Sequence, residues 1–458
     1  MEPMDLGGLL TVDTKRAATL NQGDADAARI ALFLAYARDN AQLLGLTDAF
    51  GSEPIDVAHA GKLAVRVADG LGMDERAFGK YVETIAAKDL KRALASEGIN
   101  PGALEVTGDP GADGRVSRAL DLLEDISSDR NHQIFLAEAE LARSVLLGAR
   151  DGRPIRSVCD PTCGHGGLLV RFHRAAGGAW PVVTATDTDA ASIAITSMRL
   201  LADGYRGGFE HVRQADSFAV GSVPGVGFDA VLCEAPHGPA KREAARTEVD
   251  PRILDGMDGR KWVKGDVEGL SLLRAADLLA EGGTAVVITA TGDSYALPQV
   301  GLRQRLVEDG LVEACIEIPR RLPYSWQTGL TMWVLSRRGV DGTLLAVLDG
   351  DGFQAECPDF YSSLDSLESS SRWLADLVTS RREVPFMSTV VSREKILETP
   401  GSPLRFSGYA TSIDVAGRLR EGPNADEIAA RHAEVLAGLA AAEKELDETF
   451  SRVVRPPR

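Results

Sequence analysis

The sequence lacks an apolar run long enough to cross a membrane, and its first residues, Met1-Glu-Pro-Met-Asp5, lack the basic and then apolar pattern of a secretory signal. Cysteine is sparse, with five in 458 residues and no regular spacing that would indicate a disulfide framework. Together with a hydrophobic content of 44%, these absences predict a globular cytoplasmic protein without membrane contact. The cysteines are Cys159, Cys163, Cys233, Cys315 and Cys357.

A surplus of basic residues is also missing. The chain has 50 Lys and Arg residues against 67 Asp and Glu residues, which gives a net charge of −17. A protein that grips nucleic-acid phosphates over a wide surface needs the opposite balance, so DNA binding would require local basic clusters or a partner. Each cluster, taken singly, is equally well explained as solvated surface charge. The clusters are Lys241-Arg242 with Arg246, Arg260-Lys261 with Lys264, and Arg320-Arg321.

The first part of the chain has the spacing of helices. Residues 1–22 are predicted to be poorly structured, and apolar residues then recur at helical spacing with Gly and Pro between the runs. This pattern predicts a helical domain over residues 1–120. The helices are expected at 24–44, 55–71 and 75–96.

The middle of the chain, residues 121–340, alternates strand and helix patterns at the spacing of parallel βαβ units. It predicts an α/β domain built on a mostly parallel sheet. A polar insertion over 240–267 is expected to form a lid or a DNA-contacting loop, or else to be disordered. The expected strands are 155–159, 182–186, 210–213, 228–233, 284–290, 311–318 and 330–336.

The last part, residues 341–458, has a looser pattern, with a short strand expected at 344–348 and a helix at 364–379. A long helix is predicted from Ala425 to Val453, where apolar residues recur near three, four and seven. Such a narrow stripe is typical of packing against another helix, either in a partner or within the same chain.

The stretch from Ser157 to Leu169 predicts a ligand site. It reads as a short apolar strand, then Asp160, then a glycine turn, then a helix that starts near Gly167. Glycines let a backbone turn sharply and approach a ligand, and a helix start offers unpaired N–H groups. An ordinary tight turn would carry the same glycines, so the segments that follow decide the interpretation.

Acidic residues recur where the following strands end. Asp187 and Asp189 come after the second strand, about twenty positions beyond the glycine turn, where an acid can bind ribose hydroxyls. Asp216 and Glu234 end the third and fourth units. Because ligands of open α/β sheets bind at the carboxyl ends of the strands, these acids predict a nucleotide-like ligand there.

The segment Asp160-Pro-Thr-Cys-Gly-His-Gly-Gly167 resembles the S-adenosylmethionine loop of the DNA adenine-N6 methyltransferases, above all the modification subunit of type I restriction systems. His165 stands where that family has serine. Segments 279–288, 318–329 and 403–409 also resemble the family, with the clearest similarity over residues 125–340. The resemblance implies a class I S-adenosylmethionine-dependent methyltransferase fold: a Rossmann-like, mostly parallel seven-stranded sheet with an N-terminal helical domain and a C-terminal helical tail.

The resemblance also implies the residues that bind S-adenosylmethionine. They belong to the glycine turn and to the acidic strand ends. In the family, the N-terminal domain covers DNA, and the C-terminal helices contact a specificity subunit, so a specificity-type subunit or a second copy of the chain is an expected partner. The implied cofactor residues are Asp160, Thr162, Gly164, Gly166, Gly167, Asp187, Asp189, Asp216 and Ser217.

The catalytic segment of the family is altered here. The family's Asn-Pro-Pro-Phe/Tyr accepts the two protons of the adenine N6 amine and stacks on a base flipped from the duplex. At this place the chain reads Glu234-Ala235-Pro236-His237, so Glu234, Pro236 and His237 are the implied catalytic residues. Glu remains an acceptor, although it is one methylene longer, and His can still stack. Leu136 and Ala137 also replace the family's Thr-Pro pair near the methionine end of the cofactor.

Three functions follow as alternatives. The first is an N6-adenine DNA methyltransferase that acts in restriction-modification or phage defence. The second is a binding or assembly subunit that kept the fold and lost turnover, which the altered segment and the acidic charge favour. The third is a methyltransferase with a non-DNA substrate. A zinc site formed by Cys159, Cys163, His165 and Cys233 is not expected, because the chain has no Cys-x-x-Cys pair.

Overall fold

The computed structural model describes residues 4–5, 11–12, 22–50, 59–95, 115–126, 136–176, 180–223, 227–236, 248–261, 263, 266–318, 329–348, 353, 357 and 364–409. The chain divides into two compact units, Met1–Tyr409 and Ala410–Arg458. The second unit lies outside the described residues, and with it the helix predicted from Ala425 to Val453. The following description therefore concerns the first unit.

The N-terminal region is helical, as the apolar spacing predicts. Its described residues form the helices α2 (Gln22–Asp39), α3 (Ala60–Gly70), α4 (Glu75–Thr84) and α5 (Ala87–Ala95). The run predicted over 75–96 is two helices, because α4 ends at Thr84 before an extended Ile85. Asp74 caps α4 by accepting a hydrogen bond from Ala77 N at 2.9 Å. Within residues 1–22, the short antiparallel strands β1 (Met4–Asp5) and β2 (Thr11–Val12) correct the expectation of poor structure.

Two further helices lead into the sheet, α7 (Arg115–Ile126) and α8 (Leu136–Arg150). The sheet has nine strands in the order β11-β10-β8-β9-β7-β6-β3-β4-β5. Its strands are β3 (Ser157–Asp160), β4 (Val182–Asp187), β5 (Val212–Gln214), β6 (Phe228–Glu234), β7 (Leu279–Ala290), β8 (Val312–Ile318), β9 (Leu330–Ser336), β10 (Thr343–Val347) and β11 (Ser388–Val391).

The expected seven-stranded sheet is therefore too small by two strands. The seven strands from β3 to β9 follow the predicted arrangement, with β9 antiparallel to both β7 and β8. β10 then pairs in parallel with β8, and β11 pairs antiparallel with β10 and forms the edge. β7 also begins at Leu279, five residues before the predicted start. The positive φ of 70° at Gly282 lies within this early part of the strand, and a register shift separates the Phe228 and Ala230 pairings.

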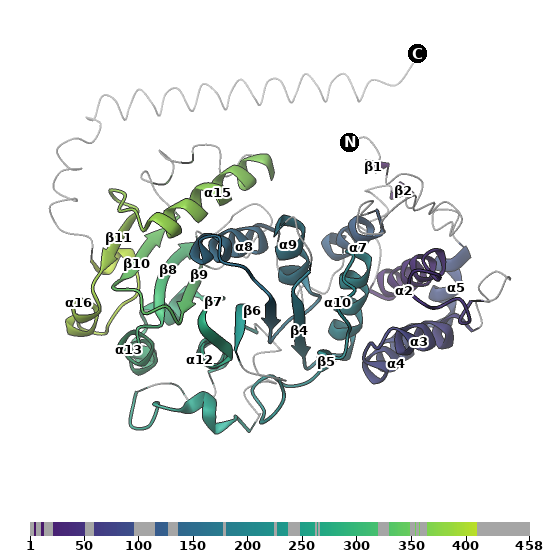
Figure 1. Ribbon diagram of the computed structural model, residues 1–458, viewed down its shortest axis with the longest axis horizontal. Helices are drawn as coiled ribbons and strands as arrows, with labels where there is room; N and C mark the ends of the chain where they lie inside the picture. Colours follow the sequence, from purple (N-terminus) through teal and green to yellow (C-terminus); the bar gives the residue numbers. More distant parts are fainter. Residues whose placement is uncertain are drawn as a thin grey trace, which may run out of the picture. The chain divides into compact units, whose positions relative to one another are not determined.

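Helices cover both faces of the sheet (Figure 1). Alternate strand residues face opposite ways, so Val158, Ala230 and Leu232 join one buried cluster while Cys159, Val231 and Cys233 join another. The first cluster includes α8, α9 (Gly167–Ala176), α10 (Ala190–Ala202) and α15 (Leu364–Ser380), together with the N-terminal helices. The second includes α12 (Val267–Leu278), α13 (Val300–Glu308) and α16 (Arg393–Glu398).

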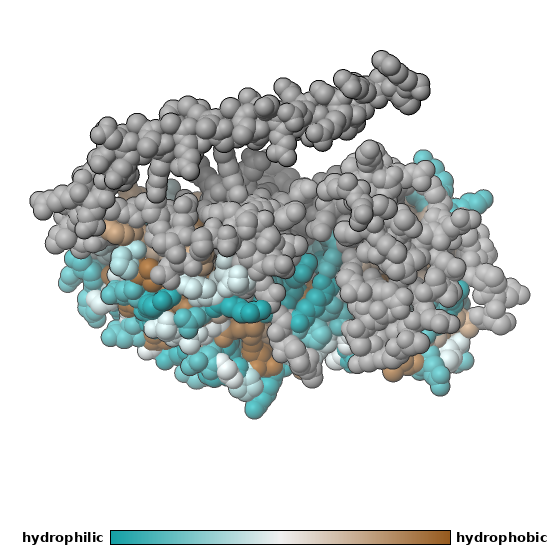
Figure 2. Space-filling view, turned by 90° about the horizontal axis from the view of Figure 1, so that it is seen from above, coloured by the Kyte–Doolittle hydropathy of each residue, from teal (hydrophilic) through white to brown (hydrophobic). Residues whose placement is uncertain are grey.

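Short 3-10 turns complete the described chain: Pro251–Leu254, Thr291–Ser294, Leu297–Gln299 and Phe406–Gly408. On the face seen in Figure 2, hydrophilic residues cover most of the described surface, and the apolar areas between them are small. Among the described residues, no helix has the length and apolar character needed to cross a membrane. The parallel strands β3, β4, β5 and β6 all end at the same edge of the sheet, where the predicted site residues meet.

Candidate functional site

The glycine loop joins β3 to α9 and adopts the tight turn that its sequence predicts. Gly164 and Gly166 have φ values of 49° and 75°, in the left-handed region that favours glycine. A Cβ at Gly166 would lie 3.0 Å from Thr196 Oγ1 on α10, so the loop backbone packs directly against that helix. α9 then begins at Gly167, which is partly exposed. The backbone can therefore approach a ligand closely at this turn.

Asp187, at the end of β4, is tied to the loop. Its Oδ2 accepts a hydrogen bond from Gly164 N at 2.9 Å, and its Oδ1 accepts one from Asp189 N, also at 2.9 Å. From α10, Thr196 Oγ1 donates to the carbonyl of Gly164 at 2.8 Å. These bonds fix the carboxylate of Asp187 in the position from which an acid can receive ribose hydroxyls, since each oxygen has a second lone pair.

Asp160 carries a buried carboxylate oxygen for which the described residues offer no hydrogen-bond partner. Its side chain is 1% exposed, and Oδ1 accepts a hydrogen bond from Thr162 N at 3.1 Å while Oδ2 accepts none. Burial raises the pKa of Asp160 well above its usual range, and the neighbouring carboxylates of Asp187 and Glu234 raise it further against the Thr162 hydrogen bond. A bound cationic donor would satisfy this oxygen. The ammonium of S-adenosylmethionine fits that requirement.

Thr162 connects the glycine loop to the predicted catalytic segment. Its Oγ1 donates to the backbone carbonyl of Glu234 at 2.9 Å and lies 3.2 Å from Cys233 Sγ. Ala235 N donates to Ile288 O at 3.0 Å, which continues the pairing of β6 with β7 beyond the end of β6. The backbone of this segment is thus held from two sides. Glu234 and Pro236 are half-buried and Ala235 is buried, and His237 lies outside the described residues.

The other predicted cofactor residues have local structural roles. Asp189 caps α10, because its Oδ2 accepts a hydrogen bond from Ser192 N at 2.8 Å. Asp216 Oδ1 accepts from Phe218 N at 3.0 Å, and the adjacent Ser217 is buried. Ala215 N donates to the carbonyl of Asp187 at 2.9 Å, so the segment after β5 lies against the end of β4. The structure thus brings the predicted residues of the four strand ends to one edge.

Sequence analysis missed a buried side chain that reaches the loop from outside the sheet. Glu124 on α7 lies 2.5 Å from Nδ1 of His165, the residue between the two left-handed glycines. Glu124 comes 41 positions earlier in the sequence. The only indication of such a partner in the sequence was His165, which stands where the related family has serine. Glu124 could therefore not be assigned to this site without the fold.

The basic clusters are only partly described. Arg260 Nη2 forms an ion pair with Glu308 Oε2 at 2.6 Å, so its charge is compensated within the chain. Lys241, Arg242, Arg320 and Arg321 lie outside the described residues, as does residue 264. Of these clusters, only Arg260 and Lys261 therefore belong to the described part of the chain.

The cysteines at this edge are thiols buried in the core. Burial raises the pKa of Cys159 and Cys163 well above the usual range and raises that of Cys233 to about 12. Metal binding needs thiolates. No group of three or more His, Cys, Asp or Glu side chains within the described ranges is arranged to hold a metal ion.

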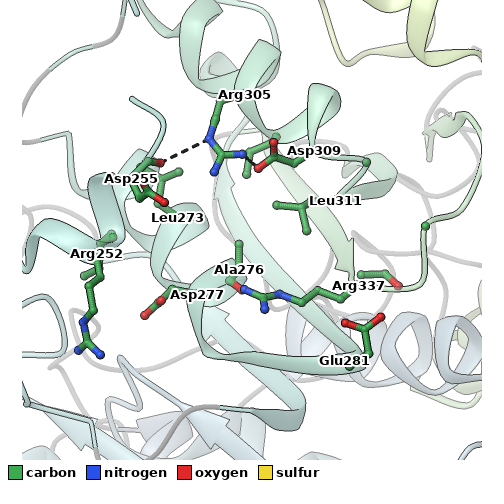
Figure 3. A pocket seen from close by; sticks show the side chains of 15 residues that line it. Arg252, Asp255, Leu273, Ala276, Asp277, Glu281, Arg305, Asp309, Leu311 and Arg337 are labelled. Carbon is green, nitrogen blue, oxygen red and sulfur yellow. Dashed lines mark hydrogen bonds and ion pairs between the residues drawn. The ribbon is translucent and has the colours of Figure 1, made fainter. Parts of the chain in front are cut away.

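A separate surface pocket of about 470 Å³ lies at the opposite edge of the sheet (Figure 3). Its walls come from the start of β7, the residues before β8 and the end of the antiparallel β9, including Glu281, Leu311 and Arg337. Arg305 is in close contact with Asp309 and donates to the carbonyl of Asp255 at 3.4 Å. Acids and arginines compensate one another here, so the pocket indicates no particular ligand.

Comparison with known proteins agrees with this geometry. The family described as N-6 DNA Methylase matches residues 139–401. The structure is similar to a type I restriction-modification methyltransferase subunit from Streptococcus thermophilus, with a TM-score of 0.59, 14% identity, and coverage of 89% of this chain and 96% of that one. No match is found among curated protein sequences.

Two further solved structures are similar. One, from Vibrio vulnificus YJ016, is provisionally named a modification subunit of a type I restriction enzyme, with a TM-score of 0.55, 13% identity, and coverage of 88% and 96%. The other belongs to work on complex assembly and conformational transition of the type I restriction-modification system, with a TM-score of 0.53, 14% identity, and coverage of 96% of both chains. At these identities the likeness concerns the fold, which is that of the class I methyltransferases.

Proposed function

Because the chain belongs to the N-6 DNA methylase family, we propose that it binds S-adenosylmethionine at the glycine loop and modifies adenine N6 in DNA, in restriction-modification or phage defence. The observation that carries the proposal is the buried oxygen of Asp160 that has no hydrogen-bond partner among the described residues. Asp160 stands at the start of the glycine loop, which Thr162 ties to Glu234. The buried oxygen of Asp160 supports binding of a positively charged cofactor, and Glu234 beside it would be the polar acceptor for the substrate.

The cofactor would supply the methyl group, carried on a sulfonium centre. Asp160 would accept a hydrogen bond from its cationic methionine end, and Asp187 would receive the ribose hydroxyls. Gly164, Gly166 and Gly167 would let the backbone approach the ligand, with Asp189, Asp216 and Ser217 completing the binding edge. Asp160 is buried, so little water would compete for its contact with the cofactor.

On the substrate side, the amine of adenine is a poor nucleophile because its lone pair is delocalised into the ring. An ionised Glu234 side chain and the backbone carbonyl of Ala235 can accept its two protons, which localises the lone pair toward the methyl donor. Thr162 restricts the backbone at Glu234, so only the side chain must adjust to the extra methylene. Pro236 and His237 would line the place of a base flipped from double-stranded DNA.

The test is N6-methyladenine formation by the purified chain on mixed-sequence DNA with S-adenosylmethionine. Glu234→Ala is expected to reduce the rate at least about a hundredfold, because it removes the only charged acceptor proposed for the amine. Cofactor affinity of the variant should stay within about threefold of the unmodified chain, since Glu234 is assigned to the substrate. Methylation that survives the substitution at full rate would reject the assigned role of Glu234.

A second candidate function is a cofactor-binding subunit without turnover. The specific observation that favours it is the segment Glu234-Ala235-Pro236, in which a longer acid and a buried alanine stand where the family has Asn and Pro. In that case the chain binds S-adenosylmethionine but yields no N6-methyladenine, and Glu234→Asn leaves this unchanged. The same assay therefore separates the two functions.

The net charge of −17 supports a partner that provides the grip on DNA. The ion pair between Arg260 and Glu308 adds to this, because it neutralises one of the predicted basic candidates within the chain. We therefore place the chain in an assembly with a specificity-type subunit or with a second copy of itself, through its C-terminal region.

A further inference from the structure

The glycine loop is held by a helix that precedes it in the chain and lies outside the sheet. His165 is 2% exposed, and its Nδ1 lies 2.5 Å from Oε2 of Glu124 on α7. Glu124 itself is 8% exposed. A buried carboxylate and a buried imidazole at this distance form a strong polar contact, because little water competes for either group.

Glu124 is fixed in turn by the N-terminal helices. Arg29 on α2 is fully buried and donates to Glu124 Oε1 from Nη2 at 2.8 Å and from Nε at 3.1 Å. Burial by itself would raise the pKa of Glu124, but the adjacent His165 and Arg29 outweigh it and hold that pKa well below its usual range. Glu124 is therefore a carboxylate held between a guanidinium and the loop.

Helix α7 also helps to hold the backbone of His165, through Arg199 on α10. Arg199 on α10 donates from Nη1 to the carbonyl of His165 at 2.6 Å and from Nη2 to Asp121 Oδ1 at 2.8 Å. Asp121 and Glu124 are three residues apart on α7 and thus share one face. α7 consequently reaches both ends of His165, its side chain directly and its carbonyl through Arg199.

We propose that Glu124 is a positioning residue of the cofactor site: through His165 it holds the glycine loop in its binding conformation and makes the N-terminal helices part of that site. The inference rests on the proposed cofactor binding. Gly164 and Gly166 flank His165, so freeing the imidazole releases the segment that a ligand must meet. A ligand that must first order a loose loop binds more weakly.

The test uses the full chain and S-adenosylhomocysteine as the probe, with calorimetry for affinity. Glu124→Gln is expected to weaken binding at least about tenfold. The matched control is Asp203→Asn. Asp203 contacts His173 Nδ1 at 2.9 Å and Arg174 Nε at 2.7 Å, and it accepts a hydrogen bond from Ser117 Oγ on α7 at 2.7 Å. It thus also ties α7 to the helical layer, but it does not touch the loop. Its affinity should stay within about twofold, although stability falls in both variants.

A double variant separates positioning from general stability. In a His165→Asn background, Glu124→Gln should change the affinity no further, because the contact through which it acts is already gone. The melting temperature should still fall with the second substitution, since buried Arg29 loses one of its two carboxylate partners in either background. Equal additional losses of affinity in both backgrounds would overturn the proposal.

Hydrogen exchange of the loop gives a readout that needs no cofactor. Amides of residues 162–167 should exchange faster in Glu124→Gln than in Asp203→Asn at equal global stability. If the unmodified chain fails to bind the probe, the proposed function fails, and the exchange comparison still decides the positioning role. Unchanged loop exchange in Glu124→Gln would reject that role, whatever the probe does.

Discussion

At the scale of single residues, the surroundings of two buried acids shift their pKa values in opposite directions. Asp160 has one backbone hydrogen bond and two carboxylate neighbours, so its pKa is raised by burial and by like charge. Glu124 is also buried, but His165 and Arg29 hold its pKa low. The first acid has no countercharge among the described residues and favours a cationic ligand, whereas the second has its countercharges within the fold. Only the first has the character of a binding residue.

Asp160→Asn is expected to stabilise the ligand-free protein and weaken cofactor binding. Asn keeps the acceptor for Thr162 N and turns an N–H donor toward Asp187 and Glu234. Because the pKa of Asp160 is raised in the folded protein, the protonated carboxyl stabilises the fold. This contribution is fully present below the unfolded pKa near 4, and it is lost as pH rises through the folded pKa. The gain over the unmodified chain should therefore grow as pH rises from about 4 toward neutrality.

Denaturant unfolding at several pH values measures this difference, and calorimetry with S-adenosylhomocysteine measures affinity. A loss of about tenfold in affinity, beside a gain in stability, would assign Asp160 to ligand binding. Thr331→Val, which removes another buried polar atom without a partner among the described residues, serves as the stability control. A stability gain that is independent of pH would contradict the charge argument.

The residues of the site could be predicted only where the signal is local. The glycines of the turn and the acids at strand ends occupy fixed offsets from apolar strands, so Asp160, Asp187 and Asp216 were placed correctly at one edge. The sequence could not distinguish a ligand-facing acid from a helix cap, and Asp189 has the latter geometry. Glu124 could not be predicted, since its contact with His165 depends on how α7 packs.

At the scale of elements, the loop and α10 form one packed unit. Gly166 leaves no room for a side chain beside Thr196, and Arg199 from the same helix holds the carbonyl of His165. The helix start at Asp189 is anchored to the end of β4 through Asp187. A change in α10 therefore reaches the glycine loop directly.

Gly166→Ala is expected to destabilise the protein and to weaken cofactor binding. The left-handed backbone costs a non-glycine residue about 1–2 kcal/mol, and the new methyl group would also press on Thr196. Gly72→Ala is the matched control, because Gly72 has a similar φ of 71° and open space around it. The difference between the two, measured by thermal unfolding, is the packing contribution at the loop. Thr196→Ala in the Gly166→Ala background should recover part of it, and equal losses at both glycines would exclude a tight contact.

The elements were predicted well where the chain is periodic. The strand β9 is buried along its whole length and is apolar at five of its seven positions, and its ends at Leu330 and Ser336 are those predicted from sequence. β11 has only four residues of mixed burial, and it pairs with β10, a strand far earlier in the sequence, for example Val391 with Thr343. Nothing local marks such an edge strand. The boundaries at residues 120 and 340 stay predictions.

At the scale of the whole molecule, the N-terminal helices and the sheet share one core. A single buried cluster includes Phe33 and Phe78 from the helices together with Val158 and Val183 from the sheet. Polar contacts follow the same junction: Asp74 accepts from Gln214 N at 2.8 Å, and Lys80 donates to the side chain of Gln214 at 2.8 Å. The helices thus support the end of β5, next to the predicted site.

Two truncations test this arrangement. A chain that lacks residues 1–114 exposes the α10 surface on which α4 packs and leaves Glu124 without Arg29, a buried charge without its partner. It is expected to lose cooperative unfolding and to bind dyes that recognise exposed apolar surface.

A chain that ends at Tyr409 keeps the whole first unit and should melt within about 2 °C of the full chain, because that unit contains both buried clusters. Calorimetric scans of the full chain and of the two truncated chains measure these differences in unfolding. A cooperative transition of residues 115–458 at the temperature of the full chain would show instead that the helices fold as an independent domain.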